Sequence, residues 1–445
     1  MPRLTADQVK ALAPDPASLR SGQGLVDPRH WPRLGADEAA LWGECKGSGQ
    51  EPYKVRVDLS NMGYACTCPS HKYPCKHVIA LMLFSATAPA KLKEKKAPAW
   101  VTEWLEKREV RKAKAEKPVR AKTETAETIQ ARQKDASRRA ARREKLAEGG
   151  VDALELWLKD FARRGLASAQ SVPAGFWEEQ AARLVDAQLP GAARLIREMS
   201  DLPGSRPDWG EVLLLRMARL HLLIQAYRRL ETLPEEARQD VRYLLGWTVN
   251  QDELLASGSG VSDDWLVAAS RTEEDEQTGL RTQVNWLWGR QTKRPAQVLN
   301  FAFRSQPLDA SLVPGLVLRG ELVFFPSAYP LRAVFRHKQV AEPSFTPGGY
   351  TGVTQLLDEY STALGRNPWL EVWPAVLEGS TPLHTETTWT LRDGQGCALP
   401  LSAQFPSAWE LFALAGGRPL VLFGTWDGGA FRPLAAWADE RYVAL

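Results

Sequence analysis

Residues 64–77 run Tyr-Ala-Cys-Thr-Cys-Pro-Ser-His-Lys-Tyr-Pro-Cys-Lys-His, and this stretch decides the fold of the N-terminal region. Its form is C-x-C-x6-C-x-H. Residues i and i+2 of an extended strand point to one face, so Cys66 and Cys68 present both thiols to the same side. Positions two apart on a helix diverge by about 200°, so we expect Cys75 just before a helix and His77 in its first turn. Three thiolates and one imidazole then complete a tetrahedral Zn²⁺ site with no open position, which is typical of structural zinc.

Two alternatives stay open at this site. In the first, the cysteines are three buried or redox-active thiols and the histidine is incidental. In the second, His71 replaces His77 as the fourth ligand. Because three thiolates give a zinc centre a net negative charge, Lys72 and Lys76 are predicted to offset that charge and to lower the pKa values of the thiols.

The composition is that of an ordinary globular protein, with 445 residues of which 44% are hydrophobic and 25% charged, enough for two or three domains. The sequence has no apolar run of roughly 18 residues or more, so a membrane span is not predicted. The N-terminus lacks the apolar core of a signal peptide, which favours the cytoplasm. Five cysteines do not make a disulfide framework, and three within ten residues indicate metal. Cys45 and Cys397 are predicted to be packing residues.

The flanks of the motif predict a small ββα-type zinc finger with additional helices over residues 1–90. A capping box at Thr5–Gln8 and the pair Asp15-Pro16 each indicate a helix start. Residues 38–68 predict an antiparallel meander because apolar side chains alternate along residues 53–59. The apolar run Val78–Phe84 predicts a short buried helix.

Residues 91–150 are predicted to be a charged linker or solvated helix. Residues 91–148 hold 19 Lys and Arg against 10 Asp and Glu, a local balance of +9 in a chain of net charge +4. The most helix-prone part is 131–147, where Arg138 shares a helical face with Arg142, and Arg139 with Arg143. These four arginines are candidate phosphate contacts for nucleic acid. The interleaved acidic residues favour a solvated linker instead.

Residues 151–256 predict an all-α region and residues 257–445 an antiparallel β-rich region. In the first, Leu154, Trp157, Leu158 and Phe161 follow helical spacing, and further helical stretches lie near 175–189, 192–200, 208–230 and 234–247. In the second, alternating segments bounded by turn residues predict strands at Val284–Trp288, Gln297–Phe303, Leu316–Phe325, Leu331–His337, Trp389–Leu391, Cys397–Leu401, Leu420–Phe423 and Phe431–Trp437. The predicted class is a multidomain α+β fold.

The motif, preceded by a β-meander and followed by an apolar helix, resembles the SWIM zinc finger. Residues 41–49 and 53–59 look similar to bacterial SWIM-finger proteins of comparable length. By this resemblance the three clustered cysteines and His77 match the four family ligands one for one. The resemblance implies a DNA-binding or protein-interaction module, and the bacterial relatives are associated with AAA+ ATPase and von Willebrand A-type partners.

Among the functions that remain, the sequence favours a protein-interaction adaptor. A closed zinc site rigidifies a small surface that core burial alone would not support. Nucleic-acid binding through the finger and the basic segment is the alternative. An enzyme is not predicted, because the sequence has no P-loop, H-E-x-x-H or G-x-S-x-G motif. The acidic run at residues 273–276 predicts a solvated hairpin tip rather than a carboxylate pair for catalysis.

Overall fold

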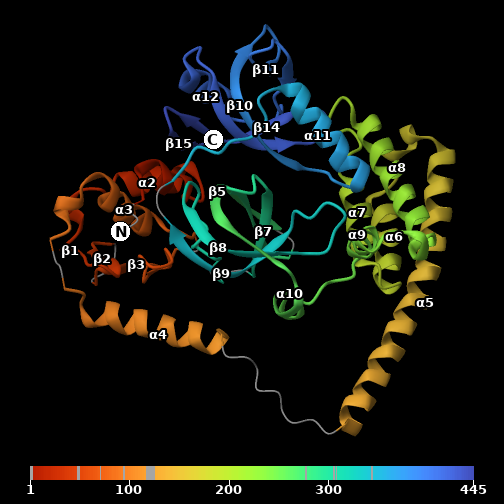
Figure 1. The fold of residues 1–445 in the computed structure, drawn as a ribbon, viewed down its shortest axis with the longest axis horizontal. Coiled ribbons are helices and arrows are strands. Elements are labelled where there is room, and N and C mark those ends of the chain that lie inside the picture. The colour runs from red at the N-terminus through yellow and green to blue at the C-terminus, as the bar shows by residue number, and fades with distance from the viewer. Residues whose placement is uncertain are drawn as a thin grey trace.

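The computed structural model describes residues 4–47, 51–70, 72–93, 96–116, 126–275, 278–303, 306, 308–341 and 344–445. The N-terminal finger and a helical bundle lie on opposite sides of a central β barrel, and a second sheet covers the barrel (Figure 1). This is the predicted multidomain α+β fold. No helix in the described ranges is long and apolar enough to cross a membrane.

Two short helices open the chain, α1 (Ala6–Ala11) and α2 (Pro16–Gln23). The predicted capping box precedes α1, since the Gln8 backbone N–H donates to Thr5 Oγ1 at 3.2 Å and the Thr5 N–H donates to Gln8 Oε1 at 2.8 Å. Asp15 caps α2 by accepting the Ser18 N–H at 2.7 Å. Both predicted helix starts are confirmed.

A four-stranded antiparallel sheet follows in the order β1-β2-β3-β4, with one more strand than the predicted meander. The strands are β1 (Arg33–Ala36), β2 (Ala40–Cys45), β3 (Tyr53–Asp58) and β4 (Tyr64–Cys66). Sequence patterns missed β1 because it is only four residues long and contains Gly35. The predicted apolar helix is α3 (Lys76–Thr87), whose residues 77–84 are all buried between this sheet and the helices α1 and α2.

Helix α4 (Ala99–Glu116) covers the other side of the finger sheet, so the predicted linker does not begin at residue 91. Its Val101 is fully buried with Ala40 and Trp42 of β2. The few large apolar residues of the segment, Trp100, Trp104 and Leu105, indicated a packed helix, although they look like exceptions in a solvated stretch.

The 39-residue helix α5 (Ala126–Arg164) runs through residue 150, where the sequence predicted a limit between linker and helical region. Ala147 and Val151 are both buried in the bundle core, so the apolar stripe begins before the predicted limit. The helix continues through Gly150, which lets α5 approach Ala187 closely, since a Cβ there would lie 2.5 Å from Ala187 Cβ. The bundle continues with α6 (Ala174–Asp186), α7 (Pro190–Ser200), α8 (Trp209–Arg228) and α9 (Glu235–Leu245), followed by α10 (Gln251–Ser257).

The first C-terminal sheet has the order β7-β6-β5-β8-β9 and curls into a partly closed barrel. The Gln297 N–H donates to Leu331 O at 2.7 Å, which draws the start of β7 toward β9. The strands are β5 (Gly260–Asp275), β6 (Leu280–Gly289), β7 (Pro295–Phe303), β8 (Val317–Phe324) and β9 (Ala333–Ala341). Sequence patterns missed β5, since its buried stretch at residues 265–269 does not alternate.

The second sheet has the order β12-β11-β10-β13-β14-β15. Its strands are β10 (Trp373–His384), β11 (Trp389–Arg392), β12 (Ala398–Pro400), β13 (Leu420–Trp426), β14 (Phe431–Ala438) and β15 (Arg441–Ala444). Two helices that the sequence did not predict, α11 (Val353–Arg366) and α12 (Ala408–Ala415), pack on it. A shared core that includes Trp288 of the barrel and Phe423 of the second sheet joins the two sheets.

Candidate metal centre

The four candidate ligands lie where β4 ends and α3 begins. Cys66 is the last residue of β4, opposite Val55 of β3, and Cys68 follows two residues later. Cys75 is the N-cap of α3, and His77 lies in the first turn of the helix. This arrangement is the one the spacing predicts, with two thiols from the strand side and two donors from the helix start.

The four donor atoms converge, with each within 4.8 Å of the others. The imidazole Nδ1 of His77 lies 3.9 Å from Cys66 Sγ and 3.9 Å from Cys75 Sγ. A tetrahedral zinc site has sulfur-to-nitrogen edges of about 3.6 Å. Cys75 and His77 are buried while Cys66 and Cys68 are half-buried. The donor set and spacing therefore fit one tetrahedral metal ion.

The thiols of this cluster have unequal proton affinities. A hydrogen bond from Cys66, together with His77 and the backbone N–H of Val78, lowers the pKa of Cys75 to about 4 against the opposing effect of burial. The pKa of Cys66 is raised because it shares a hydrogen bond with Cys75 and is buried, and burial raises the pKa of Cys68. Cys75 at the N-terminus of α3 is thus the thiolate that the protein itself stabilises.

With this geometry in place, comparison with protein families matches the SWIM zinc finger to residues 53–85, which contain all four donors. The chain carries a SWIM zinc finger. A second family, described as a SWIM-associated four-helix bundle domain, matches residues 142–245. That range starts inside α5, in agreement with the burial of Ala147, Val151, Leu154 and Leu158 in the bundle core. Searches of curated proteins and of solved structures returned no match.

The imidazole of the SWIM finger is held in place by an aromatic neighbour. The Tyr53 ring packs on His77 with centroids 5.1 Å apart and a tilt of 48°. Cys45 pairs with Tyr53 across β2 and β3 and is buried, and burial raises the pKa of its thiol to about 11. Cys45 is therefore a neutral packing residue, as predicted. Cys397 is exposed, so the packing role predicted for it is wrong.

The lysines next to the ligands do not play the predicted part. Lys72 Nζ lies 2.8 Å from Asp15 Oδ2, so this ammonium ties the ligand loop to α2 rather than facing the sulfurs. Lys76 is exposed, and its charge acts on Cys45. The alternative ligand His71 lies outside the described residues.

The four candidate arginines of α5 are not equivalent. Arg138, Arg139 and Arg142 are exposed on α5, whose N-terminal part extends away from the bundle (Figure 1). Arg143 instead donates to Gly246 O at 3.0 Å and stacks on Trp247 at 4.3 Å from the ring centroid. Arg143 is therefore a structural contact between α5 and the end of α9, and only the first three present their charge to solvent.

A stack of cationic groups and indole rings, which was not predicted from the sequence, joins α4 to the SWIM finger. Trp100 and Trp104 are four residues apart and share one face of α4. Cationic groups and rings alternate along the stack, with each cation 5.1–6.0 Å from the centroid of a neighbouring ring. The order is Lys54, Trp100, Arg56, Trp104 and Arg108. Arg108 also donates to Asp58 Oδ2 at 3.2 Å and to Asn61 Oδ1 at 2.8 Å. The spacing of the two tryptophans was the available signal.

Proposed function

We propose that the metal is zinc, bound by Cys66, Cys68, Cys75 and His77 in a structural role. Thiolate and imidazole donors in a tetrahedral set suit Zn²⁺. Four protein donors leave no position for water or substrate, so the ion joins the end of β4 to the start of α3. Metal binding then supplies folding free energy to the finger.

We further propose that the protein is a cytoplasmic protein-interaction adaptor and not an enzyme. The observation that carries this proposal is an exposed aromatic cluster where β10, β11 and α12 meet. The Trp409 side chain is 64% exposed, and its ring lies 4.8 Å from that of Trp389 and 5.1 Å from that of His384. Exposed Phe412 adjoins both tryptophans. Aromatic side chains are enriched in protein interfaces and supply much of their binding energy.

The finger contributes to this adaptor as part of a continuous scaffold. Val313 and Leu316, from the loop before β8 of the barrel, belong to the same buried core as α3. Helix α1 contacts β15 of the second sheet, with Asp7 Oδ2 3.6 Å from Arg441 Nε. Zinc thereby stabilises the part of the scaffold against which the β domains rest.

The test uses the partners that the SWIM resemblance suggests, an AAA+ ATPase or a von Willebrand A-type protein from the same organism. We expect the full-length zinc-loaded chain to bind one of them with a Kd below about 10 µM in biolayer interferometry. Trp409→Ala should weaken binding about tenfold or more, because it removes an aromatic anchor. Leu156→Ala, at a residue 60% exposed on the bundle, is the control. Equal affinity of Trp409→Ala and wild type would contradict the proposed surface.

Nucleic-acid binding is kept as a second candidate because Arg138, Arg139 and Arg142 are exposed on one projecting helix. Under this alternative, labelled duplex or single-stranded DNA should bind the full chain in fluorescence anisotropy, with affinity that falls steeply with salt. The triple Arg→Gln variant at these positions should lose that binding. No binding at low salt would remove this candidate.

A further inference from the structure

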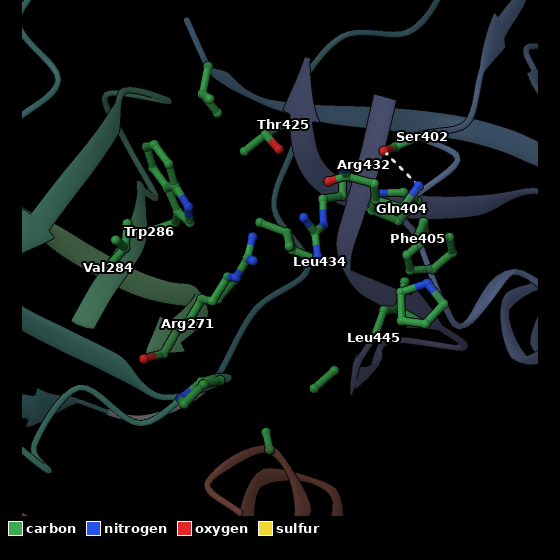
Figure 2. A pocket seen from close by; sticks show the side chains of 18 of the residues that line it. Arg271, Val284, Trp286, Ser402, Gln404, Phe405, Thr425, Arg432, Leu434 and Leu445 are labelled. Atoms are coloured by element: carbon green, nitrogen blue, oxygen red, sulfur yellow. Dashed lines mark hydrogen bonds between the residues drawn. The ribbon is translucent and has the colours of Figure 1, made fainter. Parts of the chain in front are cut away.

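A cleft of about 870 Å³ lies between the barrel and the second sheet, outside the SWIM finger's metal centre (Figure 2). Arg271 of β5 and Trp286 of β6 line the barrel side. Thr425 of β13, Arg432 of β14 and Phe405 line the opposite side. A volume in this range is typical of sites for small molecules.

Two guanidinium groups meet in this cleft. Figure 2 shows Arg271 and Arg432 extending toward one another from the two sheets. Arg271 Nε lies 3.2 Å from Glu273 Oε1, whereas the described residues provide no ion-pair partner for Arg432. The pKa of Arg432 is lowered, first by burial and then by the positive charge of Arg271. Two further carboxylates line the cleft, but Asp7 pairs with a lysine of α1 and Asp427 accepts backbone N–H groups of its own turn. Glu273 is therefore the carboxylate beside the two guanidinium groups, and an added anion would relieve their repulsion.

An aromatic side chain with an unused donor lies beside the arginines. Trp286 is only 6% exposed and lines the cleft, and no acceptor for its indole N–H occurs among the described residues. The indole nitrogen keeps some exposure to solvent, so a ligand in the cleft can accept a hydrogen bond from it. Leu434 and Phe405 add apolar surface to the same cleft. The cleft thus combines paired cations, an available donor and a flat apolar wall.

We propose that this cleft binds a small organic phosphate of nucleotide size, with the phosphate between Arg271 and Arg432 and a planar ring against Trp286. Guanidinium groups bind phosphate oxygens through pairs of parallel hydrogen bonds. Aromatic side chains provide a stacking surface for a planar ring. This site is independent of the adaptor and zinc proposals, because neither arginine contacts a metal ligand.

The experiment titrates AMP, adenosine and inorganic phosphate into the full-length zinc-loaded protein, with saturation-transfer NMR and calorimetry as readouts. AMP should bind, inorganic phosphate should compete with it, and adenosine should bind at least tenfold more weakly. Arg432→Gln should weaken AMP binding at least tenfold. Arg418→Gln is the matched control, because it removes an equal charge from an exposed arginine of the same domain outside the cleft.

Arg271→Gln is the second variant, to be used if Arg432→Gln lowers the melting temperature of the protein. It should weaken AMP binding to a similar extent, because the phosphate is placed between the two guanidinium groups. Absence of AMP binding at millimolar concentration would overturn the proposal. So would wild-type affinity in a folded arginine variant, or competition by acetate as effective as that by phosphate.

Discussion

Each ligand of the metal centre occupies a backbone setting that its sequence neighbours determine. Cys66 ends a strand and Cys75 caps a helix. His77 turns its Nδ1 toward the thiols, with the Tyr53 ring packed on the imidazole. The residues between Cys68 and Cys75 only need to reverse the direction of the chain. The contribution of each donor can therefore be tested by single substitutions.

Cys75→Ser should release the metal and loosen residues 33–87, because three donors remain and the helix start loses its thiolate. Metal content measured by mass spectrometry should fall from one equivalent toward zero, and amide exchange should accelerate in β2–β4 and α3. The bundle, which has its own core, should exchange as in wild type. Cys397→Ser, at an exposed thiol, is the control and should keep its metal. A Cys75→Ser protein with a full equivalent of zinc and unchanged exchange would contradict the ligand assignment.

Asp393 is a second residue whose charge holds backbone in place. Its carboxylate accepts the N–H groups of Val353, Gln395 and Cys397, each at 2.9 Å, and these bonds lower its pKa below the ordinary value of 3.8. A lowered pKa means that the stabilisation is present above pH 3.8 and is lost as pH falls below it.

At pH 7 we expect Asp393→Asn to lower the free energy of unfolding of the second sheet by about 1–3 kcal/mol, since buried donors lose a charged acceptor. The difference from wild type should narrow in thermal melts as the pH falls below 3.8, because the wild-type carboxylate becomes protonated. Asp439→Asn, at an exposed carboxylate of the same domain, should change little at any pH. A constant difference across this pH range would show that the charge is not responsible.

At the scale of elements, α5 shows how one helix can serve two surroundings. Its C-terminal half is buried in the bundle core, while its N-terminal half carries exposed arginines. Arg143 lies where the exposed part meets the core and bonds to the backbone at the end of α9. Helix α4 likewise is joined to the finger sheet by its two tryptophans rather than by a broad apolar stripe.

Arg143→Gln should destabilise the bundle by about 1–3 kcal/mol, because it removes a charged hydrogen bond to Gly246 O and a cation–π contact with Trp247. Urea unfolding followed by helical circular dichroism measures the change. Arg142→Gln, one residue away and exposed, should have an effect below about 0.5 kcal/mol. Equal effects of the two substitutions would show that Arg143 is not a structural contact.

At the scale of the whole molecule, one glycine lies where three regions meet. Gly315 has a φ of +81°, and a Cβ there would lie 2.8 Å from Tyr442 Cδ1 and 2.9 Å from Gln8 Nε2. The barrel, β15 of the second sheet and α1 of the finger region thus approach each other at this point. Only glycine suits both the backbone conformation and the space.

Gly315→Ala should loosen the junction between these regions, with faster amide exchange in α1 and β15. Gly417→Ala is a close control, because Gly417 has a φ of +80° but nothing within 4 Å of its Cβ position. Both variants should show the backbone cost of about 1 kcal/mol. Gly315→Ala should lower the free energy of unfolding by about 1 kcal/mol more, because the added methyl group is crowded. Identical stability of the two variants would show that the close approach of Tyr442 and Gln8 to residue 315 does not affect stability.

The sequence by itself determined the four converging donors of the finger, the capped helix starts, most strands and the α+β class, because each depends on neighbours within a few residues. It did not reveal β1, β5, β10 or β15, the helices α11 and α12, the packing of α4 on the sheet, or the continuity of α5 through residue 150. These features depend on partners far along the chain, such as Trp42 for α4 and Ala187 for Gly150. The cleft between Arg271 and Arg432 likewise depends on residues that are far apart in the sequence. Local spacing fixes which donors share a face, whereas only tertiary packing decides which distant surfaces enclose a site.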